Sequence, residues 1–220
     1  MLEAYQFAGQ HLDLVAKWAV EHLLISGVAI GSAAVIGIVF AILISGQERE
    51  RVADLVLYFT EIMMTVPSLA LFGLLMLMLG RMGLSAIGFL PAVMTLIVYG
   101  QLPILRNTYI ALRQVDPALI EAGRGMGMSE RQVLFKIKLP IALPVIFAGL
   151  RNAMVLIIGI ATIAALIGAG GFGVPIFRGL RNARMDLIII GGVSVSVLAL
   201  LVDGSMALLE RFVTSKGLKR

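Results

Sequence analysis

Long apolar stretches separated by short charged segments dominate this chain. Runs without a single Asp, Glu, Lys or Arg cover Leu23–Ile44, Ile62–Leu79, Met82–Leu105, Asn152–Phe177 and Leu187–Val202. A helix rises 1.5 Å per residue, so about 20 apolar residues are enough to cross the hydrocarbon core of a bilayer. The pattern therefore predicts an all-α integral membrane protein with about five transmembrane helices. We expect the second helix to start near Leu55 and the fifth to continue to about Leu209.

Glycine and proline refine the positions of these spans. The fourth run ends in Gly170-Gly171-Phe172-Gly173, and glycine weakens a helix interior. We therefore place the fourth span near Ile141–Ala169, with a loop starting at Gly170. Three prolines that interrupt spans either free backbone groups to line a pathway or produce a packing kink; these are Pro67, Pro91 and Pro103.

Composition agrees with a membrane environment. The chain is 60% hydrophobic and 14% charged, whereas a soluble domain is about 45–50% apolar and about 25% charged. Its formal net charge is +5, but the basic residues flank apolar runs and form no face interleaved with aromatics. This distribution argues against nucleic-acid binding. The absence of cysteine excludes disulfides and thiolate metal sites.

The distribution of basic residues predicts the orientation of the chain. If the segments around Gly46–Asp54, Arg113–Pro140 and Arg211–Arg220 are cytoplasmic, that side carries eleven Lys and Arg, and the opposite side carries five. Positive charge favours the cytoplasmic side, so the N-terminus is predicted outside and the C-terminus inside. The eleven are Arg49, Arg51, Arg113, Arg124, Arg131, Lys136, Lys138, Arg211, Lys216, Lys219 and Arg220, and the five are Lys17, Arg81, Arg178, Arg181 and Arg184.

We predict one membrane domain with two short extensions. Residues 1–18 mix apolar and polar side chains and are expected to form an interfacial segment. Residues 19–212 form the transmembrane domain, and residues 213–220 form a cytoplasmic tail. A cleaved signal peptide is not expected, because the start lacks a basic region and contains Glu3 and Asp13.

The longest charged interruption, Arg113–Pro140, carries ordered helix signals. Asp116-Pro117 is typical of a helix start, with Asp as N-cap and Pro in the first turn. Glycines between residues 123 and 127 are expected to end this helix in a tight reversal. Ser129 and Gln132 have capping-box spacing, which predicts a second short helix to about Lys138. Pro140 then marks the entry to the fourth span.

This loop resembles the signature of permease subunits of bacterial ABC importers. The signature is Glu-Ala-Ala, three residues, Gly, nine residues, Ile, one residue, Leu-Pro. It is matched here by Glu121, Ala122, Gly123, Gly127, Ile137, Leu139 and Pro140, with Gly in place of the second Ala.

Other segments are similar to permeases for osmoprotectant quaternary amines. These segments are Thr65–Leu71, Leu102–Tyr109, Val115–Leu119, Gly125–Met128 and Ala165–Gly171. One departure is Met64, where that family often has Gln.

The resemblance implies a type I ABC importer permease core in the bacterial inner membrane. Such a protein moves glycine betaine, carnitine or choline by alternating access, and has no cofactor. Residues 113–140 would couple it to a separate cytoplasmic ATPase, present in two copies. A second permease subunit, identical or different, an extracytoplasmic substrate-binding protein and membrane lipid are the other partners implied. Candidate pathway residues are Thr65, Pro67, Ser68, Gln101 and Asn107.

Other readings of single residues are less informative. His11 and His22 are too separated to define a metal site, and no catalytic constellation is present. The Gly168–Gly173 loop lacks the Lys-Ser/Thr of a phosphate-binding loop, so we expect no ATP hydrolysis by this chain and assign the loop to a gate or a binding-protein contact. Glu61 and Asp203 either have a functional role or pair with Arg106 or Arg151 near the cytoplasmic ends of the spans.

Two alternatives stay open at this point. One is an ABC importer permease for another small solute, such as an amino acid or a sulfonate. The other is a carrier driven by an ion gradient. The 113–140 loop favours the importer, because a self-contained carrier needs no element that docks an ATPase.

Overall fold

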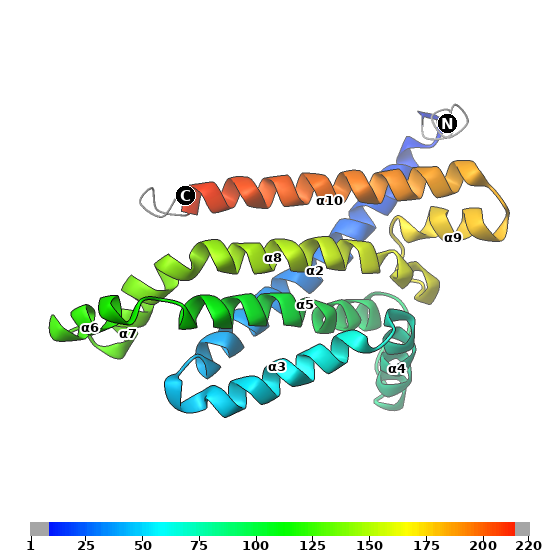
Figure 1. Ribbon diagram of the computed structural model, residues 1–220. Helices are drawn as coiled ribbons and strands as arrows, with labels where there is room; N and C mark the ends of the chain where they lie inside the picture. The colour runs from blue at the N-terminus through cyan, green and yellow to red at the C-terminus, as the bar shows by residue number, and fades with distance from the viewer. Residues whose placement is uncertain (1–8, 214–220) are drawn as a thin grey trace.

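The computed structural model describes residues 9–213, which form helices joined by short turns, with no strand in that range. Four helices are long: α2 (Leu12–Ile44), α5 (Phe89–Arg113), α8 (Leu139–Ala161) and α10 (Met185–Val213). The shorter elements are η1 (Gln47–Arg49), α3 (Glu50–Thr65), α4 (Ser68–Arg81), α6 (Pro117–Gly125), α7 (Glu130–Val133), η2 (Leu134–Lys138), η3 (Ile163–Ile167) and α9 (Gly173–Arg181). Figure 1 shows the described ends of the chain at opposite ends of the bundle.

One face of α2 brings small residues to the centre of the bundle. Helix α5 packs against both α2 and α8. On α2 the buried residues Ala29, Ala33, Gly37 and Ala41 recur every four positions, so they lie on one face. Small residues let helix backbones approach closely, which is how helices associate where lipid removes the hydrophobic driving force. The sequence therefore specifies a tight three-helix centre, in which these small residues of α2 lie beside large buried side chains such as Leu96, Ile104 and Ile157.

The predicted second span is a bent pair of helices. Helices α3 and α4 meet at an angle of 102° across a short break at Val66 and Pro67. Proline disfavours the helical conformation in the residue before it, and Val66 is extended, with a ψ of 128°. The Tyr99 hydroxyl of α5 donates a hydrogen bond to the Val66 carbonyl, which has no helical partner. Within residues 9–213, four helices are long and apolar enough to span, and the bent pair makes five if it counts as one span.

The third and fourth spans also have boundaries that differ from the sequence prediction. The third span begins at Phe89 instead of Met82, and it continues past Leu105 to Arg113. The fourth ends at Ala161 instead of Ala169, where the tighter η3 and a glycine loop take over. The start at Phe89 and the end at Ala161 are not marked by a charge, so hydropathy alone could not locate them.

The two predicted extensions lie partly outside the described residues. Residues 1–8 and 214–220 lie outside the described residues. Residues Leu12–Trp18 continue into α2 without a break, and Trp18 is buried. The interfacial position of the N-terminal segment and the cytoplasmic position of the tail stay predictions.

Candidate functional site

Helix α6 has the start that the sequence predicted. Asp116 Oδ1 accepts a hydrogen bond from the Ala118 amide at 2.9 Å, and Pro117 occupies the first helical turn. This bond satisfies one of the amides that a helix N-terminus leaves unpaired.

The end of α6 explains the fixed glycine of the motif. The Met128 amide donates to the Gly123 carbonyl at 3.1 Å, and the Gly127 amide donates to the Arg124 carbonyl at 2.9 Å. This pair of bonds is the Schellman arrangement, which requires a left-handed residue just after the helix. Gly127 fills that position with a φ of +82°.

Helix α7 begins with the predicted capping box. The Gln132 amide donates to Ser129 Oγ at 3.4 Å, and the Ser129 amide donates to Gln132 Oε1 at 2.8 Å. Across the glycine turn, Arg124 Nε donates to Glu130 Oε1 at 2.8 Å. This hydrogen bond, together with the carboxylate's charge, raises the pKa of the Arg124 guanidinium. Both side chains are exposed, so solvent screens the pair and it adds little stability.

The sequence predicted that the second short helix ends near Lys138, but the structure has no break there. After Val133 the chain passes through the π-helical turn η2 and enters α8 at Leu139 without a break. Within this turn the Leu139 amide donates to the Leu134 carbonyl, five residues back. Pro140 follows directly, in the first turn of α8. The projection is thus rigidly continuous with a transmembrane helix.

The seven motif residues fall into two groups. Gly123 is buried, and a Cβ at that position would lie 2.6 Å from Ile137 Cδ1, so Ile137 occupies the space of the missing methyl group. Gly123, Ile137, Leu139 and Pro140 therefore hold the projection together. Glu121, Ala122 and Gly127 are exposed on it. Figure 1 shows α6 and α7 at the end of the bundle far from the described N-terminal end.

A cavity of about 730 Å³ lies where this projection meets the bundle. Charged residues from five elements line it: Glu48, Arg49, Arg113, Glu121, Arg124, Glu130 and Lys138. The mixture of both signs at the base of the loop suits contact with a charged protein surface.

The candidate pathway residues do not form one cluster. Thr65, Pro67 and Ser68 lie together at the break between α3 and α4. Gln101 on α5 instead has its amide nitrogen 3.4 Å from the Ala33 carbonyl of α2. Asn107 donates to the Pro103 carbonyl of its own helix at 2.7 Å. The structure therefore separates the break from the two α5 residues, which pack inside the subunit.

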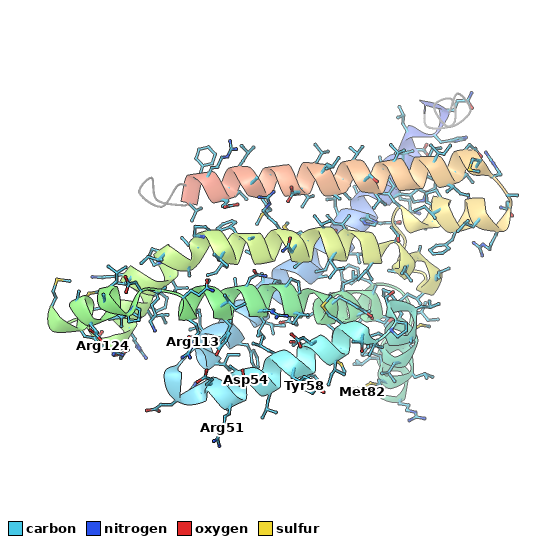
Figure 2. The ribbon with its side chains drawn as sticks, in the orientation of Figure 1. Arg51, Asp54, Tyr58, Met82, Arg113 and Arg124 are labelled. Atoms are coloured by element: carbon cyan, nitrogen blue, oxygen red, sulfur yellow. The ribbon has the colours of Figure 1, made fainter. Side chains whose placement is uncertain are left out.

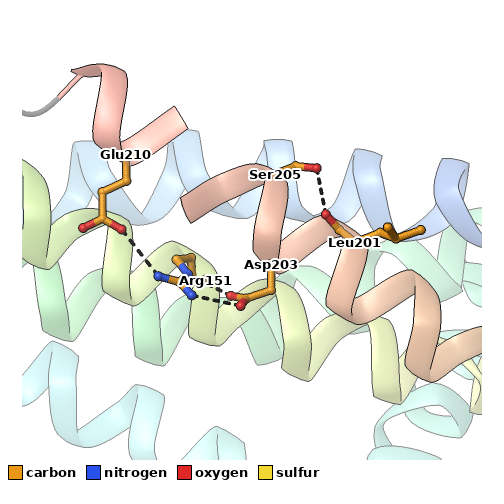
Figure 3. A network of polar contacts seen from close by, with 5 residues as sticks. All are labelled: Arg151, Leu201, Asp203, Ser205 and Glu210. Atoms are coloured by element: carbon orange, nitrogen blue, oxygen red, sulfur yellow. Dashed lines mark hydrogen bonds and ion pairs between the residues drawn. The ribbon is translucent and has the colours of Figure 1, made fainter. Parts of the chain in front are cut away.

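Both ionisable residues that the sequence singled out are paired. Arg106 Nη1 lies 2.8 Å from Glu61 Oε1, joining α5 to α3. Arg151 on α8 bonds both carboxylate oxygens of Asp203 on α10, at 2.7 and 2.9 Å. Glu210, further along α10, has its Oε2 3.5 Å from Nη1 of the same guanidinium. Arg151 therefore lies between two carboxylates (Figure 3). The pairing hypothesis is confirmed for both residues.

A polar contact that the sequence analysis missed lies at the other end of the bundle. The Gly171 amide donates to Glu21 Oε2 at 2.8 Å, and the Phe172 amide donates to His22 Nδ1 at 3.3 Å. Because Nδ1 accepts, the proton is on Nε2, which lies 3.0 Å from the Ile158 carbonyl. The glycine loop before α9 is thus held by two adjacent residues of α2. They lie 150 positions away in sequence, so a single chain gives no signal for the contact.

Comparison with known proteins places this geometry in a family. Residues 33–215 match the model of the binding-protein-dependent transport system inner membrane component family. The osmoprotectant import permease protein OsmW of Salmonella typhimurium is 39% identical over 93% of this chain and 94% of its own length. The carnitine transport permease protein OpuCB of Listeria monocytogenes is 40% identical over 98% of this chain and 94% of its own length.

Solved structures agree on the fold. A chain of the MetNI methionine ABC transporter, in an inward-facing conformation, superposes with a TM-score of 0.80 at 22% identity, covering 92% of this chain and 97% of that one. An amino acid ABC transporter solved with histidines gives a TM-score of 0.75 at 19% identity, covering 94% and 97% of the two chains. The fold is that of a type I ABC importer permease. The chain is a multi-pass membrane protein that belongs to the binding-protein-dependent transport system inner membrane component family.

Proposed function

We propose that this chain is the permease subunit of an importer for quaternary-amine osmoprotectants such as glycine betaine, carnitine or choline. The observation that carries the proposal is identity of 36–40% to permeases named for these cargoes. The matches extend over nearly the whole chain, from 90 to 98% of it for these relatives. The methionine transporter is only 22% identical, so it supports the fold and carries no weight on the cargo.

The projection formed by α6 and α7 is the element that couples transport to ATP hydrolysis. Its exposed tip, with Glu121, Ala122 and Gly127, contacts a cytoplasmic ATPase. Because α7 continues through η2 into α8, a displacement of the tip turns α8 as a unit. Helix α8 packs on α5 and α10, so the movement reaches the pathway and alternates its access between the two sides.

The complex contains two ATPases, two permease subunits and an extracytoplasmic binding protein, with the coupling projection inside the cell. Positive charge on the projection's side supports this orientation. Cysteines introduced near Ala53, at the half-exposed Val52, and at Ser215 are expected to react only with a reagent applied from the cytoplasm. Cysteines at Ser85 and Asn182 should react only from outside. Reversed labelling at Ser215 contradicts the orientation.

Uptake by the reconstituted complex tests the cargo. The complex of permease, ATPase and binding protein, in proteoliposomes containing ATP, should accumulate labelled glycine betaine, carnitine or choline. A matched preparation with a hydrolysis-deficient ATPase is the control. Uptake of an amino acid or a sulfonate, with none of any quaternary amine, overturns the proposal.

A further inference from the structure

One face of α3 carries a line of polar residues in a transmembrane pair of helices. Asp54, Tyr58 and Glu61 are spaced by four and then three positions, so they lie on the same side of the helix. Figure 2 labels Asp54 and Tyr58 along this helix. Together with Arg106 of α5 they line a groove of about 490 Å³, which Leu55 and Leu57 complete.

The side chains on this face are exposed, although burying charged groups in lipid costs free energy. Tyr58 is 63% exposed, and the side chains of Arg106 and Glu61 are 53% and 44% exposed. The other side of α3, with Ala53 and Val56, packs against α2 and α5. Ionisable side chains within spans face a water-filled cavity or another protein, because lipid does not solvate them. Asp54 belongs to the segment expected in the cytoplasm, so water reaches the groove from that end.

The charges of the groove are unbalanced. Arg106 pairs with Glu61, while Asp54 has no ion-pair partner among the described residues. Two carboxylates and one guanidinium leave one negative charge beside an aromatic ring. A quaternary ammonium group has no N–H to donate, so it is recognised by aromatic faces and by carboxylates. The groove offers both within two turns of one helix.

Resting on the proposed function, we propose that this groove is a cargo site within the permease. The ammonium group lies on the Tyr58 ring between the carboxylates of Asp54 and Glu61. A cargo that also carries a carboxylate, such as a betaine, places it on Arg106 and displaces Glu61 from that guanidinium. A cargo without a carboxylate, such as choline, leaves the Glu61–Arg106 pair intact. Arg106 thereby distinguishes the two kinds of quaternary amine.

Protection of a single cysteine from labelling tests the site directly. The chain has no cysteine, so Leu55→Cys places one thiol in the groove, and Val52→Cys places one on the same helix outside it. Both parent positions are exposed, at 68% and 50%. In the purified complete complex, glycine betaine or choline at ten times its Kd should slow maleimide labelling of the groove cysteine about tenfold, from the factor 1 + [L]/Kd. Labelling of the Val52→Cys variant should not change.

Substitutions in the Leu55→Cys background separate the roles of the side chains. Tyr58→Leu should abolish protection by both cargoes, whereas Tyr58→Phe should keep it because the ring remains. The double variant Glu61→Gln with Arg106→Gln removes both charges of the ion pair together. It should lose protection by glycine betaine, which has no cation left for its carboxylate, whereas choline should still protect because the Tyr58 ring and the Asp54 carboxylate remain.

Two results overturn the site while leaving the proposed function intact. In one, the parent complex transports glycine betaine, yet neither cargo slows labelling of the groove cysteine. In the other, both cysteines are protected equally. A parent complex that takes up no quaternary amine instead overturns the proposed function on which the site rests.

Discussion

Replacing Gly127 with valine tests how the coupling projection is built. Gly127 holds a φ of +82°, and a Cβ there meets no atom within 4 Å, so the cost inside this subunit is conformational. An L-residue in the left-handed region costs about 1–2 kcal/mol, and a β-branched residue is disfavoured further. If the turn rearranges instead, the two hydrogen bonds that end α6 are lost, each worth about 0.5–1.5 kcal/mol. A loss of 1–2 kcal/mol lowers the population of the docking conformation about 5- to 30-fold.

The assay compares three variants in proteoliposomes at equal abundance of the complex. Gly127→Val should reduce uptake about 5- to 30-fold and weaken the stimulation of ATP hydrolysis by the binding protein, with membrane insertion unchanged. Gly127→Asn adds a side chain but tolerates the left-handed conformation, so it should stay much closer to the parent. Met128→Leu keeps an apolar side chain of similar volume and should have little effect.

Two outcomes contradict this reasoning in different ways. If valine and asparagine reduce transport equally, added bulk at the docking surface matters and the backbone conformation does not. If Gly127→Val transports like the parent, the projection is not the coupling element.

Three further predictions concern packing, ion pairing and backbone strain, and each is measured by thermal denaturation of the purified complex in detergent. Gly149→Ala should destabilise the complex by about 1–3 kcal/mol, because its Cβ would lie 2.7 Å from the Pro103 carbonyl oxygen. The control Gly159→Ala, on the same helix, meets nothing within 4 Å and should be neutral or slightly stabilising, so equal midpoints for the two variants contradict this prediction. Arg151→Gln should lower the melting midpoint more than Asp203→Asn, because losing Arg151 leaves two carboxylates without a cation, whereas losing the Asp203 charge leaves Arg151 paired with Glu210. A larger fall in the midpoint for Asp203→Asn contradicts this network. Ala183→Gly should stabilise by about 1 kcal/mol, since Ala183 holds a φ of +52°, and a lower midpoint argues against strain there.

Sequence reasoning succeeded where the cause is local. The Asp116 cap and the Ser129 capping box depend on side chains within three residues of the amides they bind, so spacing alone reveals them. The pairing of Glu61 and Asp203 was also within reach, because a charge in an apolar span needs a partner and few candidates exist.

It failed where the outcome depends on distant groups or on small backbone changes. The 102° bend at Pro67 was not predicted, because a proline interrupts a span but gives no measure of the angle. Pro140 does lie at the start of α8, but the continuous passage from α7 into α8 was missed because a π-helical turn has no sequence signature. Whether Gln101 and Asn107 line the pathway stays a prediction, because polarity in a span does not say which neighbouring helix faces the side chain.

The contact between α2 and the glycine loop restricts how this protein can change over evolutionary time. A side chain at Gly170 would collide with the Glu21 carboxylate, and one at Gly171 would place its Cβ 2.9 Å from His22 Nδ1. Both glycines also have positive φ, so a substitution there is disfavoured twice. Positions 21, 22, 170 and 171 should therefore vary together among homologues. A relative with a side chain at position 171 is expected to carry a smaller residue at position 22 and a differently folded loop.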